Sequence, residues 1–176
     1  MWEWLGEALA VDFANTTKRS GHVDRELLHA PGDLSVWARR EAGRVPVVGP
    51  AEVRLPEVRA LRDAVASVLH ATVRGEPAPE PAAREVNARL HAVPLVPQLR
   101  DGDAVLEPAV PAPPLDELLA RVAHSAIELA SRGGVGFCDA PSCGQFFEQR
   151  RASQRWCSDA CGTRARVARH ADRHRA

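Results

Sequence analysis

The four cysteines constrain this chain more than any other feature, because all of them lie within its last 39 residues. They form two close pairs: four residues lie between Cys138 and Cys143, and three lie between Cys157 and Cys161. Thirteen residues separate the pairs, which is enough chain to fold back as a ribbon. Two such pairs supply the four ligands of a tetrahedral metal ion. The spacing therefore predicts a metal site in the tail.

The local sequence supports this site. Gly144 follows the first pair, and glycine permits the backbone turn that exposes amides to the sulfurs. Ser158 and Asp159 favour a helix start, so the second pair would lie at the positive end of a helix spanning about 158–174, where thiolate charge is stabilised. A ribbon followed by a ligand-bearing helix is the treble-clef type of zinc module. Four cysteines close the coordination sphere, so we expect one structural zinc ion per chain.

Two disulfides, or four unrelated thiols, are the alternatives to a metal site. The N-terminal segment carries Glu3 and Glu7 and has no basic stretch, unlike a secretory signal. No apolar run approaches the ~20 residues that span a membrane. We therefore expect a cytoplasmic protein, in which disulfides are rare. Iron could occupy the same thiolates, but iron–sulfur sites usually have tighter cysteine pairs, so zinc is favoured.

Charge is divided unevenly along the chain. Residues 138–176 carry eight arginines and four acids, a balance of +4, whereas the rest balances at −4. Arginine binds phosphates bidentately and reads guanine edges, so the tail is predicted to contact DNA. An acidic protein surface, or simple solvation of the charges, is the alternative. The candidate DNA contacts are Arg150, Arg151, Arg155, Arg164, Arg166, Arg169, His170 and Arg173.

Apolar periodicity before the tail predicts a helical body. Helices are expected over residues 1–14, 33–43, 56–74, 81–92 and 115–131. Between residues 93 and 110, two apolar runs flank Asp101-Gly102-Asp103, which indicates a hairpin that its prolines confine to an edge or a bent ribbon. The fold class is therefore mainly α with a small β-ribbon, followed by the zinc module. Because the body contains no cysteine, we expect it to keep its own core if the metal is lost.

Catalytic motifs are lacking. There is no Ser-His-Asp order, glycine-rich phosphate loop or paired-acid motif, so we expect no enzyme. Asp12, Asn15 and Thr16 form a polar group that is either a ligand site or structural; in the structural interpretation, Asn15 and Thr16 end the first helix and Asp12 holds a neighbouring loop. His124 is expected to be packed. His170 and His174 lie four residues apart and are expected to face solvent or phosphate.

The tail resembles the CGNR-type zinc finger. The residues that carry the resemblance are Arg155-Trp156-Cys157-Ser158, Cys161-Gly162-Thr163-Arg164 and the basic stretch 166–170. Thr163 stands where the family has asparagine, so the role of that position is altered here. The N-terminal part resembles the ABATE domain that accompanies this finger. Its matching residues are 9–16, Asp33-Leu34, Trp37 and 61–64.

The resemblance implies two units, a helical ABATE-like domain over residues 1–134 and a CGNR-like finger over residues 135–176. The family is described as stress-induced bacterial transcription regulators, a role that is inferred for the family. The leading hypothesis is thus a DNA-binding regulator whose body senses an unknown effector or pairs with another subunit. The alternative is a protein-interaction module whose basic helix docks on an acidic partner. A third hypothesis is a ligand-binding or enzymatic body that keeps the finger for stability.

Overall fold

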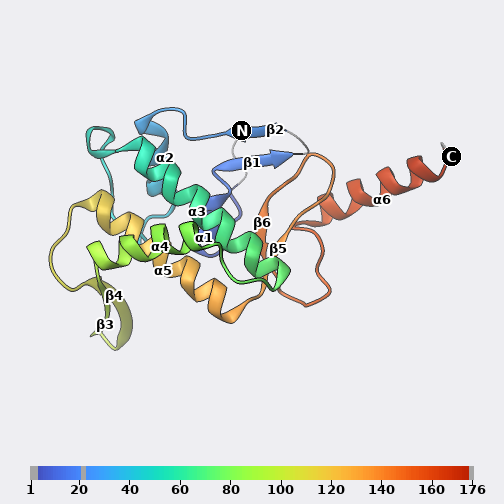
Figure 1. Ribbon diagram of the computed structural model, residues 1–176. Coiled ribbons are helices and arrows are strands. Elements are labelled where there is room, and N and C mark those ends of the chain that lie inside the picture. Colours follow the sequence, from blue (N-terminus) through green and yellow to red (C-terminus); the bar gives the residue numbers. More distant parts are fainter. Residues whose placement is uncertain (1–3, 21–22, 175–176) are drawn as a thin grey trace.

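The computed structural model describes residues 4–20 and 23–174, and it shows a helical body from which a C-terminal helix projects (Figure 1). The helices are α1 (Leu9–Ala14), α2 (Pro31–Arg40), α3 (Leu55–Arg74), α4 (Glu80–Ala92), α5 (Pro114–Arg132) and α6 (Asp159–Arg173), with a 3-10 turn at Pro50–Glu52. Three antiparallel hairpins pair β1 (Thr17–Ser20) with β2 (Val23–Glu26), β3 (Leu95–Arg100) with β4 (Asp103–Pro108), and β5 (Val135–Phe137) with β6 (Phe146–Glu148). The predicted mainly helical fold is confirmed.

The long amphipathic helices form the centre of the body. α3 packs against α4 and α5, and α1 lies across α3 and α5. Apolar side chains at helical spacing, such as Leu61 and Leu69 on α3 and Leu118 and Leu129 on α5, are buried as their periodicity predicted. Gly75 ends α3 in the left-handed conformation, with a φ of +66° that a side chain would strain.

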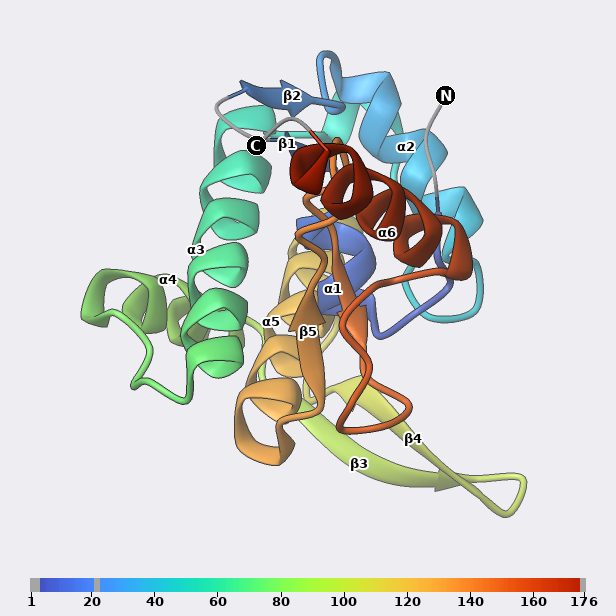
Figure 2. The ribbon, with the colours of Figure 1, turned by 90° about the vertical axis from the view of Figure 1, so that its right-hand side faces the viewer.

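The predicted ribbon between residues 93 and 110 is present as β3–β4. Asp101 and Gly102 both have positive φ, which is the geometry of a two-residue turn that follows the strand twist. The ribbon extends away from the helices as an arm (Figure 2). Leu99 near its tip is 86% exposed, because this part of the arm has no body element to pack on.

The expectation of one helix over residues 1–14 is wrong, since α1 begins only at Leu9. Gly6 has a φ of +68°, which breaks the helix, and the indole of Trp4 donates instead to Glu41 at 2.6 Å. Trp2, which falls within the expected helix, lies outside the described residues. The next segment also differs from expectation, because β1 and β2 form a hairpin between the first two expected helices, where no strand was expected.

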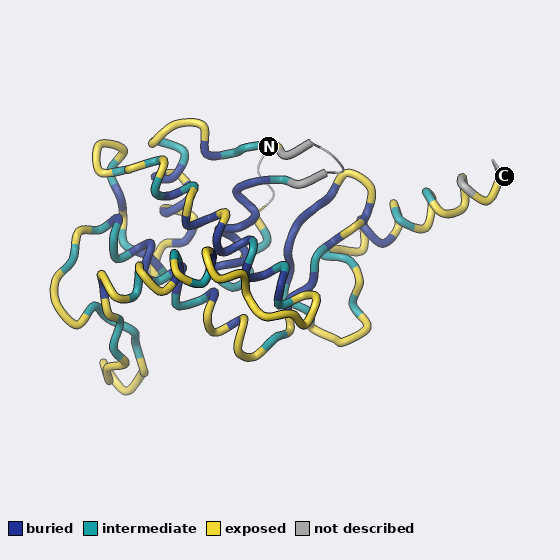
Figure 3. Tube along the Cα trace, viewed as in Figure 1, coloured by how far each residue is buried: buried dark blue, intermediate teal, exposed yellow. Residues whose placement is uncertain are grey.

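The tail ribbon is built into the core of the body, so the body and the ribbon share packing that the sequence did not predict. Val135 and Phe146, on β5 and β6, belong to the same buried cluster as α1, α3 and α5. The His70 ring of α3 lies 4.7 Å from the Phe137 ring and 4.6 Å from the Phe146 ring. Burial therefore runs from the helices through this ribbon to the first turn of α6, beyond which α6 is mostly exposed (Figure 3).

None of the described helices is long and apolar enough to cross a membrane.

Candidate metal centre and nucleic-acid surface

The four cysteine sulfurs form one cluster, each within 4.8 Å of the others. The Sγ atoms of Cys143 and Cys157 are 3.6 Å apart, and those of Cys157 and Cys161 are 3.5 Å apart. A tetrahedral zinc site with bonds of about 2.3 Å has sulfurs about 3.8 Å apart. All four are free thiols, and the cluster therefore fits a tetrahedral metal in the size and chemistry of its donors.

The first cysteine pair is shaped by the turn between β5 and β6. The amide of Cys138 donates to the carbonyl of Gln145 at 2.8 Å, and the amide of Gly144 donates back to Cys138 at 3.1 Å. Ser142 and Gly144 both have positive φ, so the chain doubles back tightly around Cys143. The predicted glycine turn is thus present, and it holds both sulfurs on one side of the ribbon.

The second pair lies at the start of α6. The Ser158 hydroxyl accepts a hydrogen bond from the amide of Cys161 at 3.3 Å, which caps the helix as its sequence predicted. Cys157 thus lies just before α6 and Cys161 within its first turn. This order of ribbon, turn and ligand-bearing helix is the treble-clef arrangement expected from the sequence.

The surroundings of the cluster favour a thiolate at Cys138, whereas hydrogen bonding to Cys138 raises the pKa of Cys143 and of Cys157. Hydrogen bonds from the thiols of Cys143 and Cys157 lower the pKa of Cys138 well below its ordinary value. The guanidinium of Arg164 lies 2.9 Å from the Cys161 sulfur and donates to it. Arg164, one of the candidate DNA contacts, is therefore turned toward the metal cluster, a role that its place in the basic run did not reveal.

Arg166, Arg169 and Arg173 lie along one exposed side of α6, while Ala165 and Ala168 on another side are half-buried. Figure 1 shows that α6 as a whole extends away from the body. Thr163, at the position where the family has asparagine, accepts from Arg166 Nη2 at 3.0 Å and donates to the Asp159 carbonyl at 3.0 Å. Thr163 thus holds the side chain of Arg166, the first of the three arginines on this side of α6.

The tail arginines differ from those of the body in their ion pairing. Most arginines of the described part of the body lie within 4 Å of a carboxylate oxygen. Within the described chain, no such ion pair forms at six tail arginines, namely Arg150, Arg151, Arg155, Arg166, Arg169 and Arg173. Within the described residues, these six guanidinium groups therefore carry positive charge with no carboxylate at ion-pair distance. His170 makes an edge-to-face contact with the exposed His174, with ring centroids 4.3 Å apart.

Asp12, Asn15 and Thr16 do not converge on one ligand site. Asn15 is the C-cap residue of α1, and its side chain also contacts the tail. Its Nδ2 donates to the Phe146 carbonyl at 3.0 Å, and its Oδ1 accepts from the Phe146 amide at 2.9 Å. Thr16 donates to the Phe13 carbonyl at 2.8 Å and so closes the helix, as predicted. The Asn15 contact with the finger was missed, because sequence gives no sign of a partner 131 residues away.

Asp12 lies in a buried charged cluster with Glu41 and Arg44. Its Oδ2 is 3.6 Å from Arg44 Nη1, and in the described part of the chain this oxygen has no hydrogen-bond partner. Burial and the nearby carboxylate of Glu41 raise the pKa of Asp12 to about 7. Arg44 also donates to Glu41 and to the carbonyl of Glu7, so this cluster ties α1 to the loop after α2. The predicted loop-holding role of Asp12 thus involves Arg44.

Two further carboxylates that sequence reasoning did not single out join the body to the tail. Glu148 on β6 accepts from the amide of Ala8 at 2.7 Å and from Arg132 at 2.5 Å, and Glu7 accepts from the amide of Glu148. These contacts add to the Asn15 clamp on the same strand, so β6 is fixed at both ends.

Two family models together match nearly the whole chain. A family model described as "Putative stress-induced transcription regulator" matches residues 7–133, and the model of the CGNR zinc finger matches residues 135–174. A search of curated proteins found no match. Because the first model covers more than half of the chain, this protein belongs to the ABATE family of stress-induced transcription regulators, and its tail is a CGNR zinc finger.

Proposed function

We propose that Cys138, Cys143, Cys157 and Cys161 bind one zinc ion, which stabilises the finger and takes no part in catalysis. The sulfur cluster supports this, since four thiolates leave no open position for a reacting group. Zinc would supply the bonds that hold the ribbon of residues 135–148 against the start of α6. Elemental analysis of purified protein should give one zinc per chain. A thiol assay that finds two disulfides and no metal would refute the assignment.

We further propose that the finger, residues 135–176, binds DNA and that the body, residues 1–134, carries it as part of a cytoplasmic regulator. The observation that carries this proposal is a set of three α6 arginines, Arg166, Arg169 and Arg173, at which no ion pair forms within the described residues. α6 projects from the body but starts at the metal cluster, so these guanidinium groups are presented from a fixed base (Figure 1). Phosphates are the ligands for which such an arginine row is suited.

The test replaces Arg166, Arg169 and Arg173 together with glutamine and measures binding to duplex DNA at several salt concentrations. If the three contact phosphates, binding should weaken equally for all DNA sequences, and the slope of log K against log salt should flatten by at most about three units. The matched control removes the same charge from exposed arginines of the body, Arg39, Arg84 and Arg100.

Equal binding by the α6 variant and the parent at every salt concentration would refute the DNA assignment of this face. The same variant would then be expected to lose an acidic protein partner. Zinc content should be unchanged in either variant, because none of the replaced residues belongs to the sulfur cluster.

A further inference from the structure

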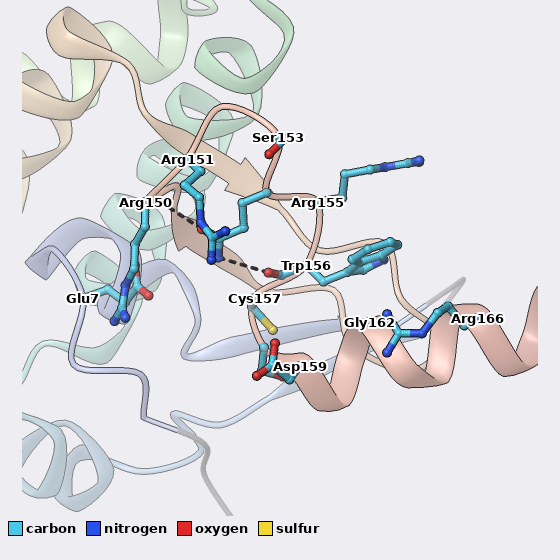
Figure 4. A pocket seen from close by; sticks show the side chains of 12 residues that line it. Glu7, Arg150, Arg151, Ser153, Arg155, Trp156, Cys157, Asp159, Gly162 and Arg166 are labelled. Atoms are coloured by element: carbon cyan, nitrogen blue, oxygen red, sulfur yellow. Dashed lines mark hydrogen bonds between the residues drawn. The ribbon is translucent and has the colours of Figure 1, made fainter.

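A cleft of about 600 Å³ lies beside the metal cluster, between the loop that follows β6 and the first two turns of α6 (Figure 4). We call it the arginine cleft. Its volume falls in the range of sites for small molecules, about 300–1,000 Å³. Its lining residues are Glu7, Arg150, Arg151, Ser153, Gln154, Arg155, Trp156, Cys157, Ser158, Asp159, Gly162 and Arg166.

The charge of the cleft favours an anion. Four arginines line it against two carboxylates, Glu7 and Asp159, which leaves an excess of two positive charges. None of those four arginines has a carboxylate oxygen within 4 Å in the described part of the chain, and the charge of Arg150 acts on Glu7 at longer range. Arg155 extends outward in Figure 4, whereas Arg166 lies with Trp156 at the α6 end of the cleft and Arg150 reaches toward Glu7 at the other. Phosphate groups match such spaced guanidinium groups.

An aromatic wall completes the cleft. The indole of Trp156 lies against Gly162, where a Cβ atom would meet the ring at 3.4 Å. The glycine therefore lets this half-buried ring pack close to α6, and the guanidinium groups of Arg155 and Arg169 lie 5.6 Å and 5.8 Å from the ring centroid. Indole rings stack with nucleobases, which contributes about 1–3 kcal/mol per base. A flat apolar face beside several guanidinium groups matches a nucleotide better than it matches inorganic phosphate.

Gln154 holds the loop in this shape. Its Nε2 donates to the carbonyl of Trp156 at 3.1 Å, its Oε1 accepts from the amide of Arg150 at 2.9 Å, and its own carbonyl accepts from Gln149 Nε2 at 3.0 Å. The loop is thus organised by one side chain that bridges the basic wall and the aromatic wall. A site that is shaped before its ligand arrives loses less entropy on binding.

We propose that the arginine cleft binds a nucleotide unit, with Arg150, Arg151 and Arg166 on its phosphates and Trp156 on its base. The unit is either a free nucleoside phosphate or an unpaired nucleotide of a nucleic-acid strand. This inference does not require the duplex-DNA function proposed above, although Arg166 belongs to both surfaces. If the ligand is free, its binding and that of DNA should therefore exclude each other.

The test titrates the zinc-loaded full-length protein calorimetrically with ADP, pyrophosphate and adenosine, and in a separate arm with a short single-stranded oligothymidylate. A free-nucleotide site should show saturable ADP binding that pyrophosphate competes for, and adenosine should bind at least 10-fold more weakly. Arg151→Gln should weaken ADP at least 10-fold, whereas the exposed α2 control Arg39→Gln should leave ADP binding unchanged. Trp156→Leu should weaken ADP but not pyrophosphate, with zinc content verifying that the variant folds.

If only the oligothymidylate binds, and Arg151→Gln and Trp156→Leu weaken it, the ligand is a strand nucleotide and not a free one. The proposal is overturned if neither ADP nor the oligothymidylate binds at millimolar concentration, or if both bind the Arg151 variant as well as the parent. Arg173 lies outside the cleft. If either of those results is found while duplex binding still depends on Arg173, the proposed DNA function stands and only the nucleotide site in the cleft is refuted.

Discussion

Replacing Asn15 with alanine removes a side chain that acts as a neighbouring strand for β6. Both of its hydrogen bonds go to the backbone of Phe146, and both residues are only 2% exposed. The variant leaves the amide and the carbonyl of Phe146 buried without their side-chain partner. Each such group costs about 1–3 kcal/mol, so the free energy of unfolding should fall by about 2–6 kcal/mol. That is a large part of a typical stability of roughly 5–15 kcal/mol.

The loss should extend to the metal, because β6 lies between the two cysteine pairs in sequence and is anchored to the body by this clamp. Urea unfolding of the zinc-loaded protein, followed by far-UV circular dichroism, measures the stability, and competition with a chelator measures the zinc affinity. Asn15→Asp should be at least as damaging, since it places a carboxylate oxygen against the Phe146 carbonyl. The control is Asn87→Ala at an exposed site on α4, which should change stability by less than about 0.5 kcal/mol.

The reasoning would be refuted if Asn15→Ala unfolded within about 0.5 kcal/mol of the parent, in the range of ordinary surface changes. A large loss of stability with unchanged zinc affinity would show that the clamp supports the body alone.

Two further predictions concern the shared core and the buried charge. Cys157→Ser should lower the zinc content. It should also reduce amide-exchange protection in α1 and α3, because β5 and β6 pack on these helices. Full protection in α1 and α3 would mean that the body folds independently of the finger. The pKa of Asp12 is about 7 in the folded state, against an ordinary 3.8, so the folded state binds this proton more tightly than the unfolded state does. The free energy of unfolding should therefore fall as pH rises from about 4 to 7, by at most roughly 4 kcal/mol. Asp12→Asn should remove this fall, measured as the difference in urea unfolding from the parent between about pH 5 and 8, while Asp103→Asn on the exposed turn should not.

Periodicity and cysteine spacing predicted much of the fold. α3 and α5 follow long apolar patterns that end in glycine, and these helices were predicted within a few residues. The sulfur cluster followed from spacing because a metal restricts the geometry of two close pairs. The shape of the finger was therefore predictable from local sequence alone.

Tertiary contacts account for what the sequence concealed. Residues 4–8 follow a helical pattern, yet Gly6 and the Trp4 contact with Glu41 hold them in an irregular path. The strand Thr17–Ser20 is polar, so it lacks the alternation that identifies a strand, and its pairing with β2 defines it. Val135 and Phe146 look like finger residues in sequence, and only packing against α1 and α3 places them in the core of the body.

The most direct test of the central claim is a titration of duplex DNA with zinc-loaded and zinc-stripped protein over a series of salt concentrations. The zinc-loaded protein should bind with a log K that falls linearly with log salt, by about 0.9 for each phosphate neutralised. Stripping the metal should abolish most of this binding, because α6 then loses the base that orients its arginines. Salt-independent binding, or equal binding by the two forms, would contradict the account.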